Sequence, residues 1–327
     1  MQLVVNTYGS YIRKNHNCFL IKNEEKTFEV SADKVESILI STSATISTDA
    51  IEFAVANNID IVFLDRYGNP YGRVWHAKLG STALIRRRQL EAALSPLGLS
   101  LVKGWVAKKI QNQIEFLKDL KKNRPGIRDE MDRHIEALIE LGKKLEDLEG
   151  SVEQNRSSIM GIEGMASAHY FEALSSALPE RWRFSGRSRD PATDAFNCLL
   201  NYGYGILYSQ VEKGCIIAGL DPYLGFLHTD NYNKKSFVFD LIEIYRTYID
   251  RTVIGLFAKK QVREDLFDPV PGGLRLNQEG KVVLIAAVNE MLDRNVPYRG
   301  RSVKIKNMIP MECHRIANSL IKPEAGK

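Results

Sequence analysis

Cysteine is scarce in this chain, and its few copies lie far apart. Cys18, Cys198, Cys215 and Cys313 form no C-x-x-C pair among the 327 residues, which argues against a zinc ribbon and against a dense disulfide framework. The sequence also shows no signal peptide, so a reduced, cytoplasmic setting is expected. No apolar run approaches the roughly 20 residues that a membrane helix needs. We therefore expect a soluble intracellular protein.

Two further absences narrow the chemistry. We find no pairing of serine or cysteine with histidine that would indicate a covalent nucleophile. Nor does one sign of charge dominate, because 45 lysines and arginines stand against 40 acidic residues. The resulting net charge of +5 permits a nucleic-acid partner but does not demand one, so local charge must decide.

The pattern of apolar residues divides the chain into a β-rich part and a helical part. Up to about Gly80, short β-rich runs such as residues 35–40 and 59–64 alternate with turn-forming residues. Beyond it, apolar residues recur at helical spacing. We predict an α+β multidomain fold with a small, mainly β N-terminal domain (residues 1–82), a linker helix (83–98) and a larger all-α C-terminal domain (99–327).

Within the helical part, the spacing predicts individual elements. An apolar stripe over residues 102–120 and a second over 131–148 predict an antiparallel helical hairpin. Later helices are predicted over residues 161–178, 194–218, 236–260 and 280–294. The run Pro269-Val270-Pro271-Gly272-Gly273 is predicted to be a loop.

One set of acidic residues with a histidine, spread over three segments, is the strongest chemical signal. Glu163 lies between two glycines near the start of a predicted helix, His228 ends an apolar turn, and Asp240 and Glu243 lie three residues apart. Carboxylate oxygens with one imidazole nitrogen suit a divalent cation such as Mg²⁺ or Mn²⁺. In a slightly basic protein, such a site points toward phosphodiester chemistry.

Each of these residues also has a simpler structural interpretation. Asp240 and Glu243 would share one helix face and could be a solvated acidic pair, but their apolar neighbours place them near the core, where unpaired charge is costly. Glu163 at a helix start would complement the helix macrodipole. A lone histidine is more often structural than a ligand. We keep the structural interpretation for the other five histidines, His16, His76, His134, His169 and His314. His169 alone is also left open, because it follows Glu163 on the same predicted helix, although its side chain would face away from Glu163.

Basic residues gather in stretches that suit nucleic-acid contact. Arginines alternate with aromatic and small residues over positions 181–189, and a second basic stretch covers 294–306. Guanidinium groups among aromatic rings suit phosphate contact and base stacking, although a solvated loop explains the first stretch equally well. The predicted DNA-binding residues are Arg181, Arg183, Arg187, Arg189, Arg246, Arg299 and Arg301.

The segments around the acidic set resemble four signatures of a known family. Gly161-Ile162-Glu163-Gly164 with Tyr170-Phe171 is similar to the first signature of the CRISPR-associated integrase, the catalytic subunit of the spacer-acquisition machinery. Residues 187–204, 219–228 and 236–243 resemble the second, third and fourth, in the family's order. The resemblance covers nearly the whole chain. Departures from the usual pattern, at Cys198 and Ile244-Tyr245, look like packing substitutions.

The resemblance implies a metal site, an activity and partners. Glu163, His228 and Glu243 become ligands of Mg²⁺ or Mn²⁺, and Asp240 becomes a nearby catalytic carboxylate. The implied activity is that of a DNA endonuclease and integrase, which inserts foreign DNA fragments as new spacers into a CRISPR array by attack of a 3′-hydroxyl on a phosphodiester. The implied partners are double-stranded DNA (prespacer and CRISPR repeat), a second copy joined through the β domain, and a small dimeric protein of the same machinery.

Two other functions stay open at the level of sequence. A general metal-dependent nuclease acting on branched DNA in repair would use the same residues without a repeat or a partner protein. A non-catalytic scaffold would use the carboxylates only to cap helices, so replacing Glu163 or His228 by alanine would change stability and not activity.

Overall fold

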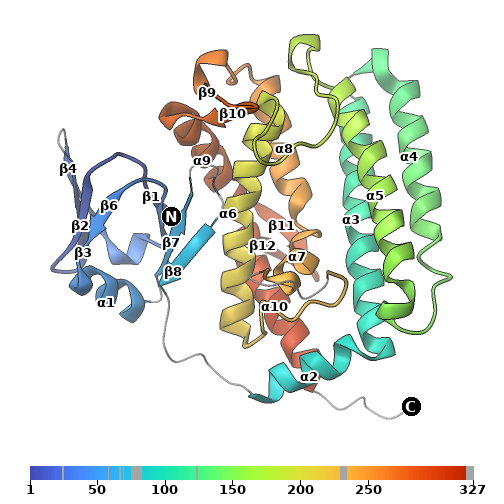
Figure 1. The fold of residues 1–327 in the computed structure, drawn as a ribbon, viewed down its shortest axis with the longest axis horizontal. Coiled ribbons are helices and arrows are strands. Elements are labelled where there is room, and N and C mark those ends of the chain that lie inside the picture. The colour runs from blue at the N-terminus through green and yellow to red at the C-terminus, as the bar shows by residue number, and fades with distance from the viewer. Residues whose placement is uncertain are drawn as a thin grey trace.

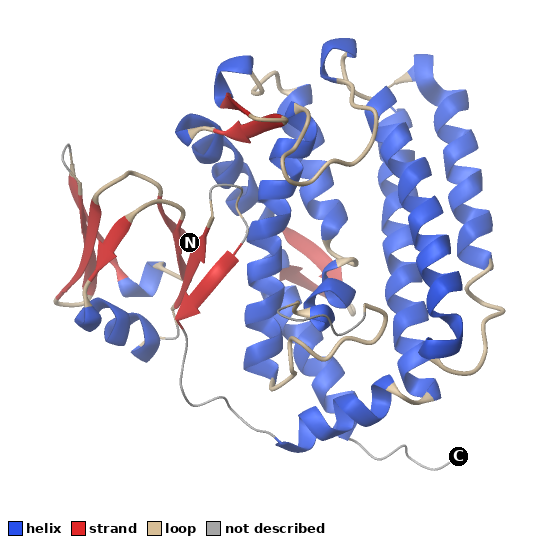
Figure 2. Ribbon diagram, viewed as in Figure 1, coloured by secondary structure: helices blue, strands red, loops and turns tan. Residues whose placement is uncertain are grey.

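The structure is a computed structural model that describes residues 1–23, 26–57, 59–65, 68, 70–74, 83–122, 124–228 and 234–321. A β-rich N-terminal part lies beside a larger, mostly helical C-terminal part (Figure 1), and strands are concentrated in the former (Figure 2). The predicted α+β fold is confirmed. The join between the two parts, residues 75–82, lies outside the described residues, so the domain limits 1–82, 83–98 and 99–327 stay a prediction. None of the described helices is long and apolar enough to cross a membrane.

Two four-stranded sheets make up most of the N-terminal part. The first has the order β1-β5-β7-β8, with β1, β5 and β7 parallel and β8 antiparallel to β7. The second has the order β4-β3-β2-β6. Ile12, Phe19, Ile38 and Ile61 are fully buried in one core. Leu39 on β5 and Val62 on β7 are buried in the core of the helical part, so these two parallel strands are covered on both faces. The strands are β1 (Gln2–Val5), β2 (Ser10–Asn15), β3 (Cys18–Lys22), β4 (Thr27–Ser31), β5 (Ser37–Ile40), β6 (Ala44–Ile46), β7 (Asp60–Leu64) and β8 (Pro70–Val74), with helix α1 (Thr48–Ala56) between β6 and β7.

The C-terminal part is built around one buried helix. Most residues of α6 are buried, and α7, α8, α9 and α10 pack around it, while α3, α4 and α5 form a neighbouring group of long helices (Figure 1). The predicted helical hairpin corresponds to α3 and α4. The helices are α2 (Ala83–Ala93), α3 (Pro96–Lys122), α4 (Arg128–Lys143), α5 (Val152–Ser176), α6 (Ala195–Ala218), α7 (Ser236–Ile242), α8 (Arg246–Ala258), α9 (Gln278–Leu292) and α10 (Ile305–Ile321).

Three local predictions are wrong, each for an identifiable reason. Helix α5 begins at Val152, because Ser151 and Gln154 form a capping box there. Glu163 is therefore in mid-helix and does not complement a helix start. The predicted helix over 236–260 is two helices, since α7 ends at Ile242. The expected loop at 269–273 belongs to a hairpin of β9 (Phe267–Val270) and β10 (Gly273–Leu276).

That hairpin and a second one, β11 (Asn295–Tyr298) with β12 (Arg301–Lys304), make the C-terminal part mostly helical but not all-α. Both are two-stranded and pack on helices, which short hairpins need for stability.

A buried charge network joins the two parts. Arg73 on β8 lies 3.3 Å from Asp60 on β7 and 3.4 Å from Glu212 on α6, and it donates a hydrogen bond to the backbone oxygen of Ser209. Burial raises the pKa of Asp60, and the positive charge of Arg73 opposes that rise. Because an unpaired buried charge is expensive, these contacts fix β8 against α6.

Candidate metal and nucleic-acid site

Residues from several segments converge on one cavity in the C-terminal part. It has a volume of about 630 Å³ and is lined from α3, α5, the loop before α6, α6 itself, the turn before α7, α7 and α8. The structure brings the three predicted metal ligands, Glu163, His228 and Glu243, to this cavity. The carboxylate of Glu163 is 13% exposed and that of Glu243 is 7% exposed. Segments up to 80 residues apart in sequence thus present two carboxylates and an imidazole to one space.

Lys109 is the residue that sequence reasoning missed. Its Nζ lies 2.6 Å from Oε1 of Glu163 and 2.6 Å from Oε2 of Glu243, so one ammonium group bridges both carboxylates. Burial lowers the pKa of Lys109, but the charges of Glu243 and Glu163 outweigh that effect and raise the pKa overall. In the sequence, Lys109 stands within the apolar stripe of the first hairpin helix. A lysine at a core-facing position of a helix was the available signal for a buried acid partner.

Arg246 is the second cation beside Glu243. Its Nε lies 2.8 Å from Oε1 of Glu243, and its guanidinium group lies 4.7 Å from the centre of the Tyr204 ring. Burial by itself would raise the pKa of Glu243. The positive charges of Arg246 and Lys109 outweigh that effect and lower the pKa to about 2. Glu243 is therefore ionised at neutral pH. Glu243 thus lies between two cations, Lys109 and Arg246.

Asp240 faces away from Glu243 and toward the turn that carries His228. Its Oδ2 accepts hydrogen bonds from the backbone N–H groups of Phe226 and Leu227, at 2.6 and 3.2 Å, and its Oδ1 accepts from the backbone N–H of His228 at 3.0 Å. The same Oδ1 lies 2.7 Å from Nδ1 of the His228 ring. Asp240 thus fixes the position of His228 and leaves the other ring nitrogen, Nε2, to face the cavity.

The break between α7 and α8 explains how two nearby acids acquire separate partners. Glu243 follows the last residue of α7. Asp240 contacts the turn before α7, whereas Glu243 contacts Lys109 on α3 and Arg246 on α8. Burial lowers the pKa of His228, but its bond to Asp240 and the charges of Asp240, Glu163 and Glu243 raise it overall. The imidazole therefore lies close enough to both glutamates to sense their charge.

A second layer of buried hydrogen bonds supports α5, α6 and α8. Asp250 accepts hydrogen bonds from the hydroxyl groups of Tyr170, at 2.7 Å, and Tyr204. Burial raises the pKa of Asp250 to about 6, although both tyrosines and the arginines Arg187 and Arg246 lower it. The sequence placed Tyr204 in the core, and the structure places it at the cavity wall as well.

Asp250 should give the protein a pH-dependent stability that an Asp250→Asn variant lacks. A carboxyl group whose folded-state pKa is raised from 3.8 to about 6 stabilises the fold fully below pH 3.8, and that contribution is lost as pH rises through 6. Between about pH 4 and about pH 7, the free energy of unfolding of the wild type should fall by up to about 3 kcal/mol relative to Asp250→Asn. Urea unfolding across this range measures the difference, and parallel curves for the two proteins would contradict it.

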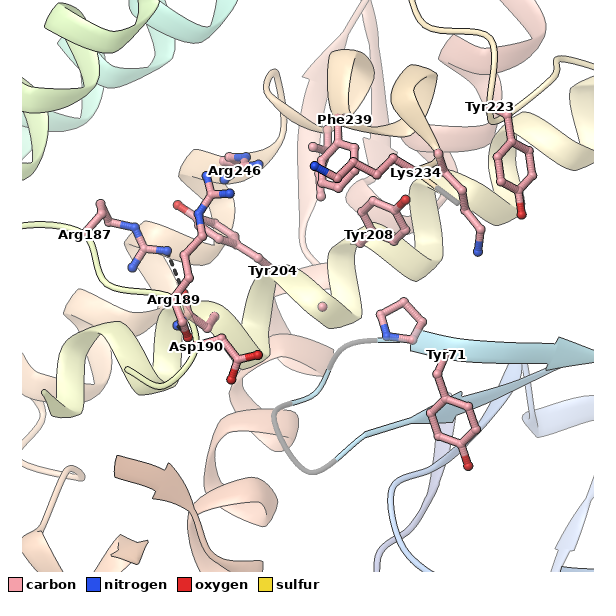
Figure 3. A pocket seen from close by; sticks show the side chains of 15 residues that line it. Tyr71, Arg187, Arg189, Asp190, Tyr204, Tyr208, Tyr223, Lys234, Phe239 and Arg246 are labelled. Atoms are coloured by element: carbon pink, nitrogen blue, oxygen red, sulfur yellow. Dashed lines mark hydrogen bonds between the residues drawn. The ribbon is translucent and has the colours of Figure 1, made fainter. Parts of the chain in front are cut away.

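A neighbouring cavity extends the site toward the N-terminal part. It has a volume of about 730 Å³ and shares Arg187, Arg189, Tyr204, Lys234, Phe239 and Arg246 with the first. In Figure 3, Arg187, Arg189 and Arg246 gather at one end and Lys234 and Tyr223 at the other, with Tyr71 on the far side. The shared walls are mostly cationic. Lys234, which sequence reasoning missed, is exposed and lines both cavities.

The structure separates the predicted DNA-binding arginines into three groups. Arg189 and Arg246 line both cavities together with Arg187, which donates to Asn201 at 2.7 Å and to Asn197 and therefore also orders its own loop. Arg181 and Arg183 lie farther along that loop; Arg183 lines an adjoining cavity and Arg181 stacks over Trp182. Arg299 and Arg301 belong to the β11–β12 hairpin and line neither of the two joined cavities.

The chain is thus an α+β protein, and its helical part lines one cavity with carboxylates, an imidazole and cations. The family model of CRISPR associated protein Cas1 matches residues 3–290. The chain therefore belongs to the Cas1 family.

Known proteins of this family are similar along most of their length. The CRISPR-associated endonuclease Cas1 1 of Archaeoglobus fulgidus is 34% identical over 97% of this chain and 95% of its own length. Among solved structures, a Cas1 protein from Thermotoga maritima has a TM-score of 0.83 and 24% identity, covering 100% of this chain and 99% of its own. A casposase bound to integration product has a TM-score of 0.85 and 24% identity, covering 98% and 90%. The last two likenesses show the shared fold.

Proposed function

We propose that this protein is a divalent-metal-dependent DNA integrase and endonuclease that inserts foreign DNA fragments as new spacers into a CRISPR array. The observation that supports this most directly is the convergence of Glu163, His228 and Glu243 on one cavity whose other walls are cationic. The relative from Archaeoglobus fulgidus is named an endonuclease, and the casposase of the same fold is described as bound to integration product. Family, residues and charge point to the same activity.

The donor set fits a divalent cation. Two glutamates already share one cation, the Lys109 ammonium group, and Oε2 of Glu243 is buried without a hydrogen bond of good geometry. Glu163, His228 and Glu243 would hold Mg²⁺ or Mn²⁺. When bound, the ion would polarise a phosphodiester and stabilise the charge that develops on it.

The chain's own residues would position the ligands and the DNA. Asp240 holds the His228 ring through Nδ1, Lys109 holds both glutamates in place, and Arg246 holds Glu243. In strand transfer, the oxygen of a 3′-hydroxyl bonds to phosphorus while the bond from phosphorus to the repeat's own 3′ oxygen breaks. The proton lost by the attacking hydroxyl is matched by one gained by the leaving oxygen. Water in place of the 3′-hydroxyl would give cleavage.

Arg189 and Lys234 are the best placed residues for the DNA backbone. The two side chains are exposed and line the two joined cavities. Exposed cationic side chains can bind DNA phosphates without first breaking a buried ion pair. Arg181 and Arg183 would extend this contact along the loop. Arg299 and Arg301 would contact DNA only beyond the joined cavities.

Integration at both ends of a repeat needs two active sites at a fixed separation. We propose that a homodimer built on residues 1–82 supplies them, and that a small dimeric partner protein of the same machinery bridges two such dimers. A structure with a TM-score of 0.80 to this chain is titled Cas6-RT-Cas1--Cas2 complex. The two sheets leave β1, β8, β4 and β6 as edge strands, and an edge strand can pair with a second copy.

Replacing Lys109 by methionine should destabilise the metal-free protein and make its stability depend more strongly on the metal. Without the bridging ammonium group, two buried carboxylates would face each other, which we expect to cost about 3 kcal/mol. Added Mn²⁺ should then raise the melting temperature of Lys109→Met more than that of the wild type. The control is Lys108→Met, an exposed neighbour on α3. Equal melting temperatures and equal metal shifts in all three proteins would contradict the role of Lys109.

A large side chain at Gly164 should leave the fold intact but reduce the rate of DNA joining. A Cβ at Gly164 or at Gly161 would meet no atom within 4 Å, and both glycines lie in α5, where leucine is a better helix former. Only Gly164 lines the cavity of Glu163. We expect Gly164→Leu to reduce DNA joining by about 10-fold or more, as a misplacement of the substrate does, while Gly161→Leu keeps full activity. Gel-based joining assays and thermal melts of both variants measure this, and equal activity would place the DNA elsewhere.

The test of the proposed function is strand transfer of a short DNA duplex with free 3′-hydroxyls into a supercoiled plasmid that carries a repeat. The full chain would be assayed with Mn²⁺ or Mg²⁺, with and without the small partner protein. Covalent joining at the repeat ends supports the integrase. Cutting of branched DNA without joining, even with the partner present, would favour a repair nuclease.

A further inference from the structure

A second group of ligand-type side chains lies on α4 and α5, outside the cavity of Glu163. Nδ1 of His134 and Nδ1 of His169 lie 3.3 Å apart. One ring nitrogen of each histidine and a carboxylate oxygen of Glu172 lie within 4.8 Å of one another. Within the described part of the chain, no other set of three His, Cys, Asp or Glu residues meets this criterion. From the sequence we expected only a structural role for His134, and we left the role of His169 open.

The distance between the two ring nitrogens matches the edge of a metal tetrahedron. For a zinc–nitrogen distance of about 2.0 to 2.1 Å, two ligands at the tetrahedral angle lie about 3.3 to 3.4 Å apart. An N–H···N hydrogen bond between the two imidazoles is the alternative explanation for a distance of 3.3 Å, and the metal-binding test below distinguishes the two. Their rings are tilted by 58°, with centroids 5.6 Å apart, so they are not stacked.

The chemistry of the three groups also suits zinc. His134 is buried, and a neutral imidazole offers a lone pair on one ring nitrogen to a metal ion. Glu172 lies one helical turn beyond His169 on the same face of α5. It is exposed, so a rotamer change can bring its carboxylate to a shared ion, and Glu130 on α4 adds a further negative charge near His134.

We propose that His134, His169 and Glu172 form a zinc site that joins α4 to α5, separate from the site of Glu163, with water as the fourth ligand. Two histidines and one carboxylate are a common zinc ligand set. Helix α5 also carries Glu163, six residues before His169, so the ion would act on the helix that supplies a residue of the first site. A bound ion would hold the middle of α5 against α4.

The proposal is tested by metal content and by spectroscopy on the full chain. The purified protein would be stripped with a chelator, loaded with Zn²⁺ or Co²⁺, and passed over a desalting column. We expect one tightly held ion in the wild type and in Glu163→Gln, and the intense visible absorption of tetrahedral Co²⁺ in both. His169→Gln and Glu172→Gln should each weaken zinc binding by about 100-fold, at least the loss seen for changes around a metal ligand.

Thermal melting keeps the test valid if one variant folds poorly. Zinc should raise the melting temperature of the wild type and not that of Glu172→Gln, whose exposed side chain is dispensable for the fold. Two results would overturn the proposal. The wild type could retain less than half an ion per chain, or the ion could be lost in Glu163→Gln but not in His169→Gln. The first result would leave a histidine–histidine hydrogen bond, and the second would assign the ion to the Glu163 cavity.

Discussion

Glu163→Gln is expected to reduce both DNA joining and metal-dependent DNA cleavage by about a thousandfold or more, with the fold intact. The change replaces the carboxylate of a proposed metal ligand by a neutral amide but keeps the size of the side chain. Lys109 would still be paired with Glu243 at 2.6 Å, so no buried cation is left alone. The free energy of unfolding should therefore change by no more than about 1 kcal/mol in the absence of metal.

The measurement is single-turnover strand transfer in Mn²⁺, with circular dichroism melts of the same samples. Glu140→Gln is the matched control, because Glu140 is an exposed glutamate on α4 that pairs only with Lys143 at the surface. Joining by Glu163→Gln at the wild-type rate would mean that the active site lies elsewhere. A loss of stability without a loss of activity would favour the non-catalytic scaffold.

Asp240→Asn is expected to harm both stability and activity, and for two separable reasons. Asp240 accepts three backbone N–H bonds and one bond from the His228 ring, and its side chain is fully buried. An asparagine has only one accepting oxygen, so buried donors lose partners, at a cost of about 3 kcal/mol. The His228 ring also loses the group that orients it, which should reduce the rate by about 10- to 100-fold.

His228→Gln distinguishes the two effects. It removes the proposed ligand but leaves Asp240 bonded to the backbone of residues 226–228, so activity should fall at least as far as in Asp240→Asn while the melting temperature changes much less. Thermal melts and metal-dependent cleavage of both variants measure this. If Asp240→Asn retained wild-type stability, the hydrogen bonds around Asp240 would not hold the turn as described.

The sequence is informative where local pattern and packing agree. Alternation in residues 1–74 and helical spacing beyond Ala83 specify strands and helices because the residues that define them are the ones that become buried. The order of strands in the sheets, in contrast, could not be predicted from such patterns. Parallel pairing of β1, β5 and β7 joins segments far apart in the chain, and no local pattern records which strands become neighbours.

The errors arose where a local signal competed with a second local signal or with a contact far away in sequence. Glycines at 161 and 164 suggested a helix start, yet α5 runs through both because its cap lies at Ser151. Apolar residues on both sides of Glu243 suggested one continuous helix. The chain instead breaks there, and Glu243 lies between Lys109 and Arg246. At α5 the local capping box decides the start of the helix, and at Glu243 the ion pair with Lys109 on α3 joins residues far apart in sequence.

The sequence by itself determined the family resemblance, the fold class and the identity of Glu163, His228, Asp240 and Glu243 as candidate residues, because motifs and periodicity are properties of the chain order. Only the tertiary structure decided what each of them contacts. It placed Lys109 between two glutamates, turned Asp240 toward His228, and brought His134 beside His169. The physical reason is that the charge partner of a buried group is set by distance in space, which the order of residues along the chain does not specify.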